Sequence, residues 1–188
     1  MFIQTEQTPN PNALKFLPGR EVLSGASVDI ESAEKAKAMS PFAARLFDVN
    51  GVSGVFLASD YISVTKADDV DWIRIKPLIL AVIMDHMGAN LPILDENGAY
   101  TASDAADDVE LDEISQQIVE LIDMRIRPAV AQDGGDIEFS KFEDGIVYVQ
   151  MRGACSGCPS ATLTLKSGIE NMLKHYVPEV IEVRELPM

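Results

Sequence analysis

Short runs of alternating apolar and polar residues predict strands in the first half of the chain. Residues 2–17 predict two strands around a turn, because the sequence Pro-Asn-Pro-Asn at positions 9–12 opposes regular structure while its flanks favour strands. Residues 55–58 and 61–65 predict a second hairpin. Helices are predicted over residues 33–38, over 41–47 and from Asp71 to about Met87.

The second half begins with apolar residues at helical spacing. They predict a helix over residues 114–125, which Pro128 ends or kinks before a glycine turn at Asp133-Gly134-Gly135-Asp136. A hairpin follows over residues 137–142 and 146–151, then a loop, a helix over 161–176 and a last strand over 180–186.

Between these halves, residues 89–111 lack apolar periodicity and are rich in Asp, Ala and Ser, as in an acidic, flexible linker. We therefore expect two small domains, at residues 1–88 and 112–188, each with helices packed on a small sheet. Strands and helices do not alternate regularly in either half, so the predicted fold class is α+β.

Charge and hydropathy exclude several functions. The net charge of −15 opposes binding to nucleic acid or to anionic membrane surfaces. Residues 78–84 form an apolar run of only seven residues, too short to span a bilayer. The start of the chain resembles no targeting segment, which predicts a cytoplasmic protein with no membrane partner.

The clearest chemistry lies in Cys155 and Cys158, the two cysteines of the chain, which are spaced as CxxC in a glycine-flanked loop. Pro159 suits the first turn of a helix, so both sulfurs are expected at a helix N-terminus. The positive end of the helix dipole favours thiolates, the form that binds metals. The hydrophobic core of the domain is expected to lie away from this pair.

Several readings of the pair remain open. An iron–sulfur cluster usually needs four thiolates, so two chains related by a two-fold axis would have to share one. A monomeric dithiol-disulfide oxidoreductase would need a single chain. A zinc site would need further ligands, for which His86 and His175 are the histidines available, and a pair of ordinary buried cysteines is the simplest case.

Longer stretches around the pair resemble a known family. RIRPAVAQDGGDIEF, GIVYVQMRGACSGCPSATLTLKSGIENML and YVPEV resemble the C-terminal domain of the NifU and Nfu families. TPNPNALKFLPG and SPFAARLFDVNGVSGVFLASDYISVTK, with the helix that contains Trp72, resemble the Nfu N-terminal domain.

The resemblance implies a non-enzymatic carrier that binds a [4Fe-4S] cluster between two protomers and transfers it to apo-proteins. Cys155 and Cys158 match the family's cluster ligands, and the resemblance implies no catalytic residues. The implied partners are apo iron–sulfur client proteins, upstream cluster-assembly proteins and a second copy of the chain when the cluster is loaded. The expected compartment is the bacterial cytoplasm, or the mitochondrial matrix for a mature eukaryotic form.

Overall fold

The N-terminal domain consists of a five-stranded antiparallel sheet and three helices. The computed structural model describes residues 2–25, 27–95, 112–156 and 159–186. The sheet has the order β1-β2-β5-β4-β3. Its elements are β1 (Gln4–Gln7), β2 (Ala13–Leu17), β3 (Val28–Ile30), α1 (Ala33–Met39), α2 (Pro41–Phe47), β4 (Val52–Leu57), β5 (Ile62–Lys66) and α3 (Trp72–Gly88).

The two predicted hairpins and the predicted helices of this domain are confirmed. Strand β1 pairs antiparallel with β2, and β4 with β5. Ser40 caps α2, because its hydroxyl accepts a hydrogen bond from the Ala43 amide at 2.9 Å and Pro41 occupies the first turn. Strand β3 was not predicted, since its three residues are held by pairing with β4 and not by a local pattern.

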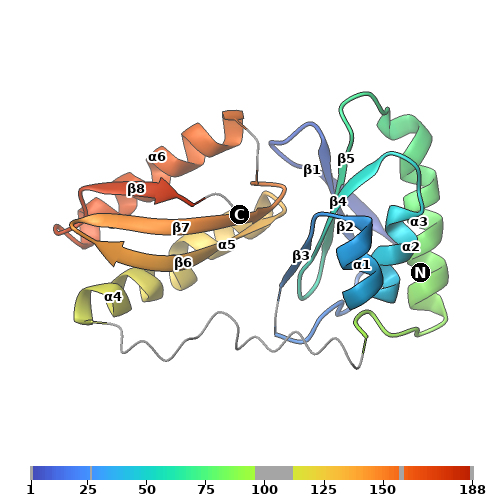
Figure 1. Cartoon of the computed structure of the whole chain (residues 1–188), viewed down its shortest axis with the longest axis horizontal. Helices are drawn as coiled ribbons and strands as arrows, with labels where there is room; N and C mark the ends of the chain where they lie inside the picture. The colour runs from blue at the N-terminus through green and yellow to red at the C-terminus, as the bar shows by residue number, and fades with distance from the viewer. Residues whose placement is uncertain (1, 26, 96–111, 157–158, 187–188) are drawn as a thin grey trace.

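The core of the domain lies between the helices and one face of the sheet (Figure 1). Phe16, Ile62 and Val55 are completely or almost completely buried there against Phe42 and Ile79 of the helices. Burial of such side chains supplies about 1.5–3 kcal/mol each relative to exposure, so this layer is a major source of stability for the domain.

The C-terminal domain packs its helices on a three-stranded sheet of order β6-β7-β8. Strands β6 and β7 form the predicted antiparallel hairpin, whereas β8 runs parallel to β7 after the long helix α6. The elements are α4 (Glu113–Leu121), η2 (Ile122–Ile126), α5 (Arg127–Gln132), β6 (Gly135–Glu143), β7 (Ile146–Gly153), α6 (Pro159–Tyr176) and β8 (Glu182–Glu185).

The helix before β6 differs from its prediction. Pro128 does not end it, because η2 is a turn of π-helix that is followed directly by α5, with Pro128 in the first turn of α5. A proline is tolerated at that position, where its missing N–H has no intrahelical partner to lose. Ile122, Ile126 and Val130 stay on the buried side through this change of pitch.

The first residues of the segment after α3 contact the N-terminal domain. The Ser40 hydroxyl donates to the Ile93 carbonyl oxygen at 2.5 Å, and the Asp95 amide donates to the Met39 carbonyl oxygen at 2.9 Å. Residues 96–111 lie outside the described residues, so the linker at 89–111 and the domain limits 1–88 and 112–188 stay a prediction.

The expected fold class is confirmed: the chain is α+β, with two domains that each pack helices on a small sheet. Figure 1 shows one end of the β6–β7 hairpin directed toward the sheet of the N-terminal domain. Within the described part of the chain, no helix has the length and apolar character needed to cross a membrane.

Candidate functional site

Cys155 lies in the turn that joins β7 to α6, and α6 begins at Pro159. This agrees with a cysteine loop directly before a helix. Cys158 falls outside the described residues. The Cys155 side chain is only 2% exposed and belongs to the hydrophobic cluster of the C-terminal domain, beside residues such as Met151. The expectation that the core lies away from Cys155 is therefore wrong.

The glycine turn at positions 133–136 forms one wall of the site. Gly135 and Gly153 are paired residues of β6 and β7, so the turn lies beside the cysteine loop. A Cβ atom on Gly135 would lie 2.7 Å from the Cys155 Sγ and 2.6 Å from the Arg152 carbonyl oxygen. Glycine is thus required for the sulfur to pack here. The sequence alone had suggested turn formation as the whole role of this segment.

Side chains of the N-terminal domain reach the same turn. The Ser63 hydroxyl donates to the Gly134 carbonyl oxygen at 2.6 Å, and the Tyr61 hydroxyl donates to the Gly135 carbonyl oxygen at 2.8 Å. Burial raises the pKa of Tyr61 above its usual value, and the nearby Asp136 and Cys155 raise it further. Tyr61 therefore stays a neutral hydrogen-bond donor at physiological pH.

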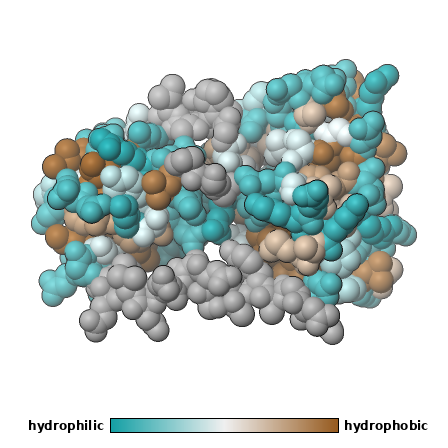
Figure 2. All heavy atoms as spheres, in the orientation of Figure 1, coloured by the Kyte–Doolittle hydropathy of each residue, from teal (hydrophilic) through white to brown (hydrophobic). Residues whose placement is uncertain are grey.

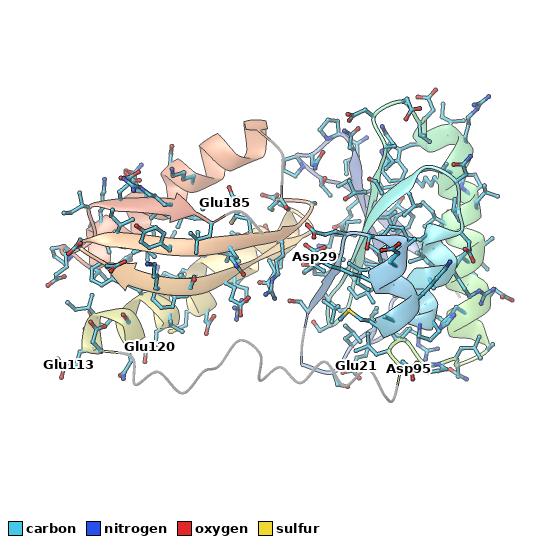
Figure 3. The ribbon with its side chains drawn as sticks, viewed as in Figure 1. Glu21, Asp29, Asp95, Glu113, Glu120 and Glu185 are labelled. Atoms are coloured by element: carbon cyan, nitrogen blue, oxygen red, sulfur yellow. The ribbon has the colours of Figure 1, made fainter. Side chains whose placement is uncertain are left out.

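Acidic side chains also border the site. The Asp29 carboxylate accepts a hydrogen bond from the Gly153 amide at 2.9 Å, and Figure 3 shows Asp29 where the two domains meet. Burial raises the pKa of Asp29, while the hydrogen bond from Gly153 opposes that rise. Asp136 accepts from Arg127 Nε at 3.0 Å and from the Ser27 hydroxyl at 2.7 Å. Both carboxylates thus order the backbone beside Cys155 and have polar partners of their own.

Neither histidine supports a zinc site in the described residues. His86 is buried in the N-terminal domain, where its Nε2 lies 3.0 Å from the Pro92 carbonyl oxygen and its ring packs on Phe42. His175 is exposed and stacks edge-on against Tyr176. Among the residues that the structure describes, no three His, Cys, Asp or Glu side chains are grouped to hold a metal ion.

A surface hollow of about 530 Å³ lies beside the turn between β1 and β2. Two of its polar lining residues bond within the chain, since Trp72 Nε1 donates to the Pro11 carbonyl oxygen at 3.1 Å and Lys76 Nζ donates to Thr5 Oγ1 at 2.8 Å. The hollow offers no group of side chains with a specific ligand chemistry, so the cysteine loop remains the candidate site.

Sequence patterns missed the part of the site that comes from the first domain. Tyr61, Ser63 and Asp29 lie in or next to short strands, where nothing in the local pattern distinguishes them from ordinary polar positions. Ser63 gave no signal, because a polar residue between Ile62 and Val64 is the alternation expected of a strand with one face toward solvent.

The fold and the site define a two-domain α+β protein in which a cysteine turn precedes a long helix and contacts the sheet domain before it. Residues 3–90 match the family described as "Scaffold protein Nfu/NifU N terminal", and residues 108–184 match the "NifU-like domain". The chain belongs to the Nfu/NifU-like family.

Several named relatives cover nearly the whole chain. The "NFU1 iron-sulfur cluster scaffold homolog, mitochondrial" of Drosophila persimilis is 49% identical over 99% of this chain and 65% of its own length. "NifU-like protein 4, mitochondrial" of Arabidopsis thaliana is 48% identical over 98% of this chain and 66% of its own length. The human "NFU1 iron-sulfur cluster scaffold homolog, mitochondrial" is 47% identical over 99% of this chain and 72% of its own length. The chain thus spans about two thirds of the length of these relatives.

Proposed function

We propose that this chain is an iron–sulfur cluster carrier in which Cys155 and Cys158 from each of two chains hold one [4Fe-4S] cluster. The names of its relatives, which include iron–sulfur cluster scaffolds, support this role. The structural observation that carries the proposal is the position of Cys155 in the turn before α6. The positive end of a helix dipole stabilises thiolates, which are the ligands that such a cluster requires.

Four thiolates require two copies of the pair, so the cluster-loaded form is proposed to be a homodimer with two-fold symmetry. The cluster is cargo: upstream assembly proteins would load it, and thiols of apo iron–sulfur client proteins would replace those of the carrier. This exchange involves no turnover of a small substrate, so the chain is proposed to be a carrier and not an enzyme.

The proposal includes a compartment. The mitochondrial names of the relatives favour the mitochondrial matrix, the second of the two compartments expected from the sequence. The bacterial cytoplasm stays a prediction. Both compartments keep cysteines reduced, as ligand thiolates must be.

Anaerobic reconstitution with iron and sulfide tests the proposal. The expected result is about four irons and four sulfides per two chains, in a dimer that returns to a monomer when the cluster is removed. Analysis of zinc in the same sample tests the zinc alternative. A monomer that holds no iron and reduces a model disulfide would instead favour the dithiol-disulfide oxidoreductase.

Paired substitutions identify the ligands. Cys155→Ala is expected to abolish cluster retention, whereas Ser156→Ala, in the same turn, should leave the iron content unchanged. Because Cys155 packs in the core, circular dichroism of both variants is needed to show that the domain stays folded. Retention of a full cluster by folded Cys155→Ala would contradict the assignment of Cys155.

A further inference from the structure

The sheet of the N-terminal domain is buried on one face and partly buried on the other. Its apolar side chains point to α1, α2 and α3, and the alternate positions point to the C-terminal domain. Ser63 lies between the core residues Ile62 and Val64 and is only 1% exposed, because the other domain covers it. Side chains of the second face that bond across the boundary between the domains are Lys15, Asp29 and Ser63, with Asn10, Ser27 and Tyr61 from the adjoining segments.

This second face binds backbone groups around the cysteine turn. Asn10 Nδ2 donates to the Ala154 carbonyl oxygen at 3.1 Å, directly before Cys155, and the Asp29 carboxylate accepts from the Gly153 amide at 2.9 Å. With the bonds from Tyr61 and Ser63 to the glycine turn, the contacts cover both backbone segments that enclose the Cys155 sulfur.

The contacts of Lys15 also indicate that the second face of the N-terminal sheet is complementary to the C-terminal domain. Its side chain is almost fully buried, and its Nζ donates to the Ala131 carbonyl oxygen at 2.9 Å. The same nitrogen lies over the Tyr61 ring at 4.5 Å, and Glu6 lies 3.7 Å away. A buried lysine is costly unless its charge has partners. The docked C-terminal domain provides one of them.

The contact between the two domains also depends on a glycine of the C-terminal domain. Gly134 has φ +80°, and a Cβ atom there would lie 2.8 Å from Ser63 Oγ. The absence of a side chain therefore allows the hydroxyl of Ser63 to reach the carbonyl oxygen of Gly134, which also accepts from the Ala154 amide at 3.2 Å.

We propose that the second face of the N-terminal sheet is a docking surface for the cysteine turn, so that the cluster-free chain closes on its own Cys155. This rests on the proposed function, because the closed chain matters only if Cys155 must meet a partner chain. In the closed form the N-terminal domain binds the backbone of the cysteine turn at Gly153 and Ala154, so it occupies the side of the turn that a second copy would have to approach. Closure and cluster sharing therefore compete, and release of the N-terminal domain precedes dimer formation.

The thiol reactivity of the cluster-free chain tests closure without any cluster. In the full chain carrying Cys158→Ser, Cys155 is the single thiol, and its rate of alkylation by iodoacetamide reports its exposure. Ser63→Trp is expected to force the domains apart and raise this rate at least about tenfold, the effect of losing roughly one buried hydrogen bond. Ser53→Trp, in the exposed part of the same sheet, should leave it unchanged.

A second variant keeps the test decisive if Ser63→Trp fails to fold. Lys15→Met keeps the length of the side chain and removes the bond to Ala131, so it should also speed alkylation while circular dichroism stays unchanged. Rates equal to those of the parent in both folded variants, or a parent rate equal to that of the chain in urea, would overturn closure.

Hydrogen exchange of the unaltered chain adds a test without substitutions. In the closed form the Gly153 amide is bonded to Asp29, so it should exchange slowly in the cluster-free protein and faster after cluster loading. Equal exchange with and without the cluster would refute release on loading. Failure of the chain to take up iron would refute the proposed function, whereas the alkylation rates would still decide closure.

Discussion

The Tyr61 hydroxyl and the Gly135 carbonyl oxygen lie 2.8 Å apart and form a hydrogen bond between the two domains. Tyr61 follows β4 in the N-terminal domain, whereas Gly135 begins β6 and lies against the Cys155 sulfur. The bond therefore links the first domain to the backbone that packs on the cysteine. Figure 2 shows hydrophilic side chains over much of the visible surface where the domains approach each other.

Tyr61→Phe removes this bond and keeps the ring. The Gly135 carbonyl oxygen would lose its bond to the phenol, and we expect the free energy of unfolding to fall by about 1–3 kcal/mol. Urea denaturation followed by fluorescence measures the change. Tyr176→Phe is the control, because Tyr176 is 46% exposed and makes ring contacts that Phe retains. Equal stability of the two variants would show that the bond contributes nothing.

Gly135→Ala places a methyl group against Cys155 Sγ and the Arg152 carbonyl oxygen. Such overpacking is expected to destabilise the C-terminal domain by about 1–3 kcal/mol, measured by thermal unfolding. Gly168→Ala, within α6, meets no atom within 4 Å and should stabilise by about 0.5–1 kcal/mol, because glycine is a poor helix former. If Gly135→Ala and Gly168→Ala changed the stability in the same direction, the close contact at Gly135 would not be what requires glycine there.

Arg127→Lys should weaken the connection between α5 and β6. The guanidinium pairs with Asp136 through Nε at 3.0 Å and donates from Nη2 to the Ile137 carbonyl oxygen at 3.1 Å. Lysine cannot reproduce this fork, so we expect a loss of about 1–2 kcal/mol in urea denaturation.

The matched control for that change is Arg184→Lys. Arg184 is half exposed and pairs with Glu182 on the surface of β8, so its replacement should change stability by less than about 0.5 kcal/mol. A larger loss for Arg184→Lys than for Arg127→Lys would contradict the role assigned to Arg127.

The stability of the N-terminal domain should depend on pH through the protonation of His86. Burial lowers the pKa of His86 below its usual value of 6.5, and the nearby Arg45 lowers it further, although the Pro92 carbonyl oxygen opposes this. The unfolded chain thus binds a proton more readily. The contribution is fully present above pH 6.5 and is lost as the pH falls toward the lowered folded-state value.

Urea denaturation between about pH 7.5 and pH 5 measures this dependence, and His86→Gln should reduce it. Glutamine can still donate to the Pro92 carbonyl oxygen and does not titrate, so the comparison isolates the proton. An unchanged pH dependence in the variant would assign the effect to other groups.

The local sequence determined what depends on near neighbours. The two hairpins of the first domain, the cap at Ser40 and the long helix after the cysteines follow from turn residues, capping residues and helical spacing. These patterns also fixed the α+β class, and the CxxC pair with its flanking motifs indicated the family.

Tertiary structure decided the features that need distant partners. The strand at Val28–Ile30 exists because β4 is available to pair with it, and the parallel pairing of β8 with β7 follows from the path of α6. The contacts of the cysteine turn likewise depend on groups distant in sequence, because Asn10, Tyr61 and Ser63 bind the backbone around Cys155 from the other domain. Local patterns carry no record of a contact across more than 70 residues, as between Ser63 and Gly134, since it forms only when two folded surfaces meet.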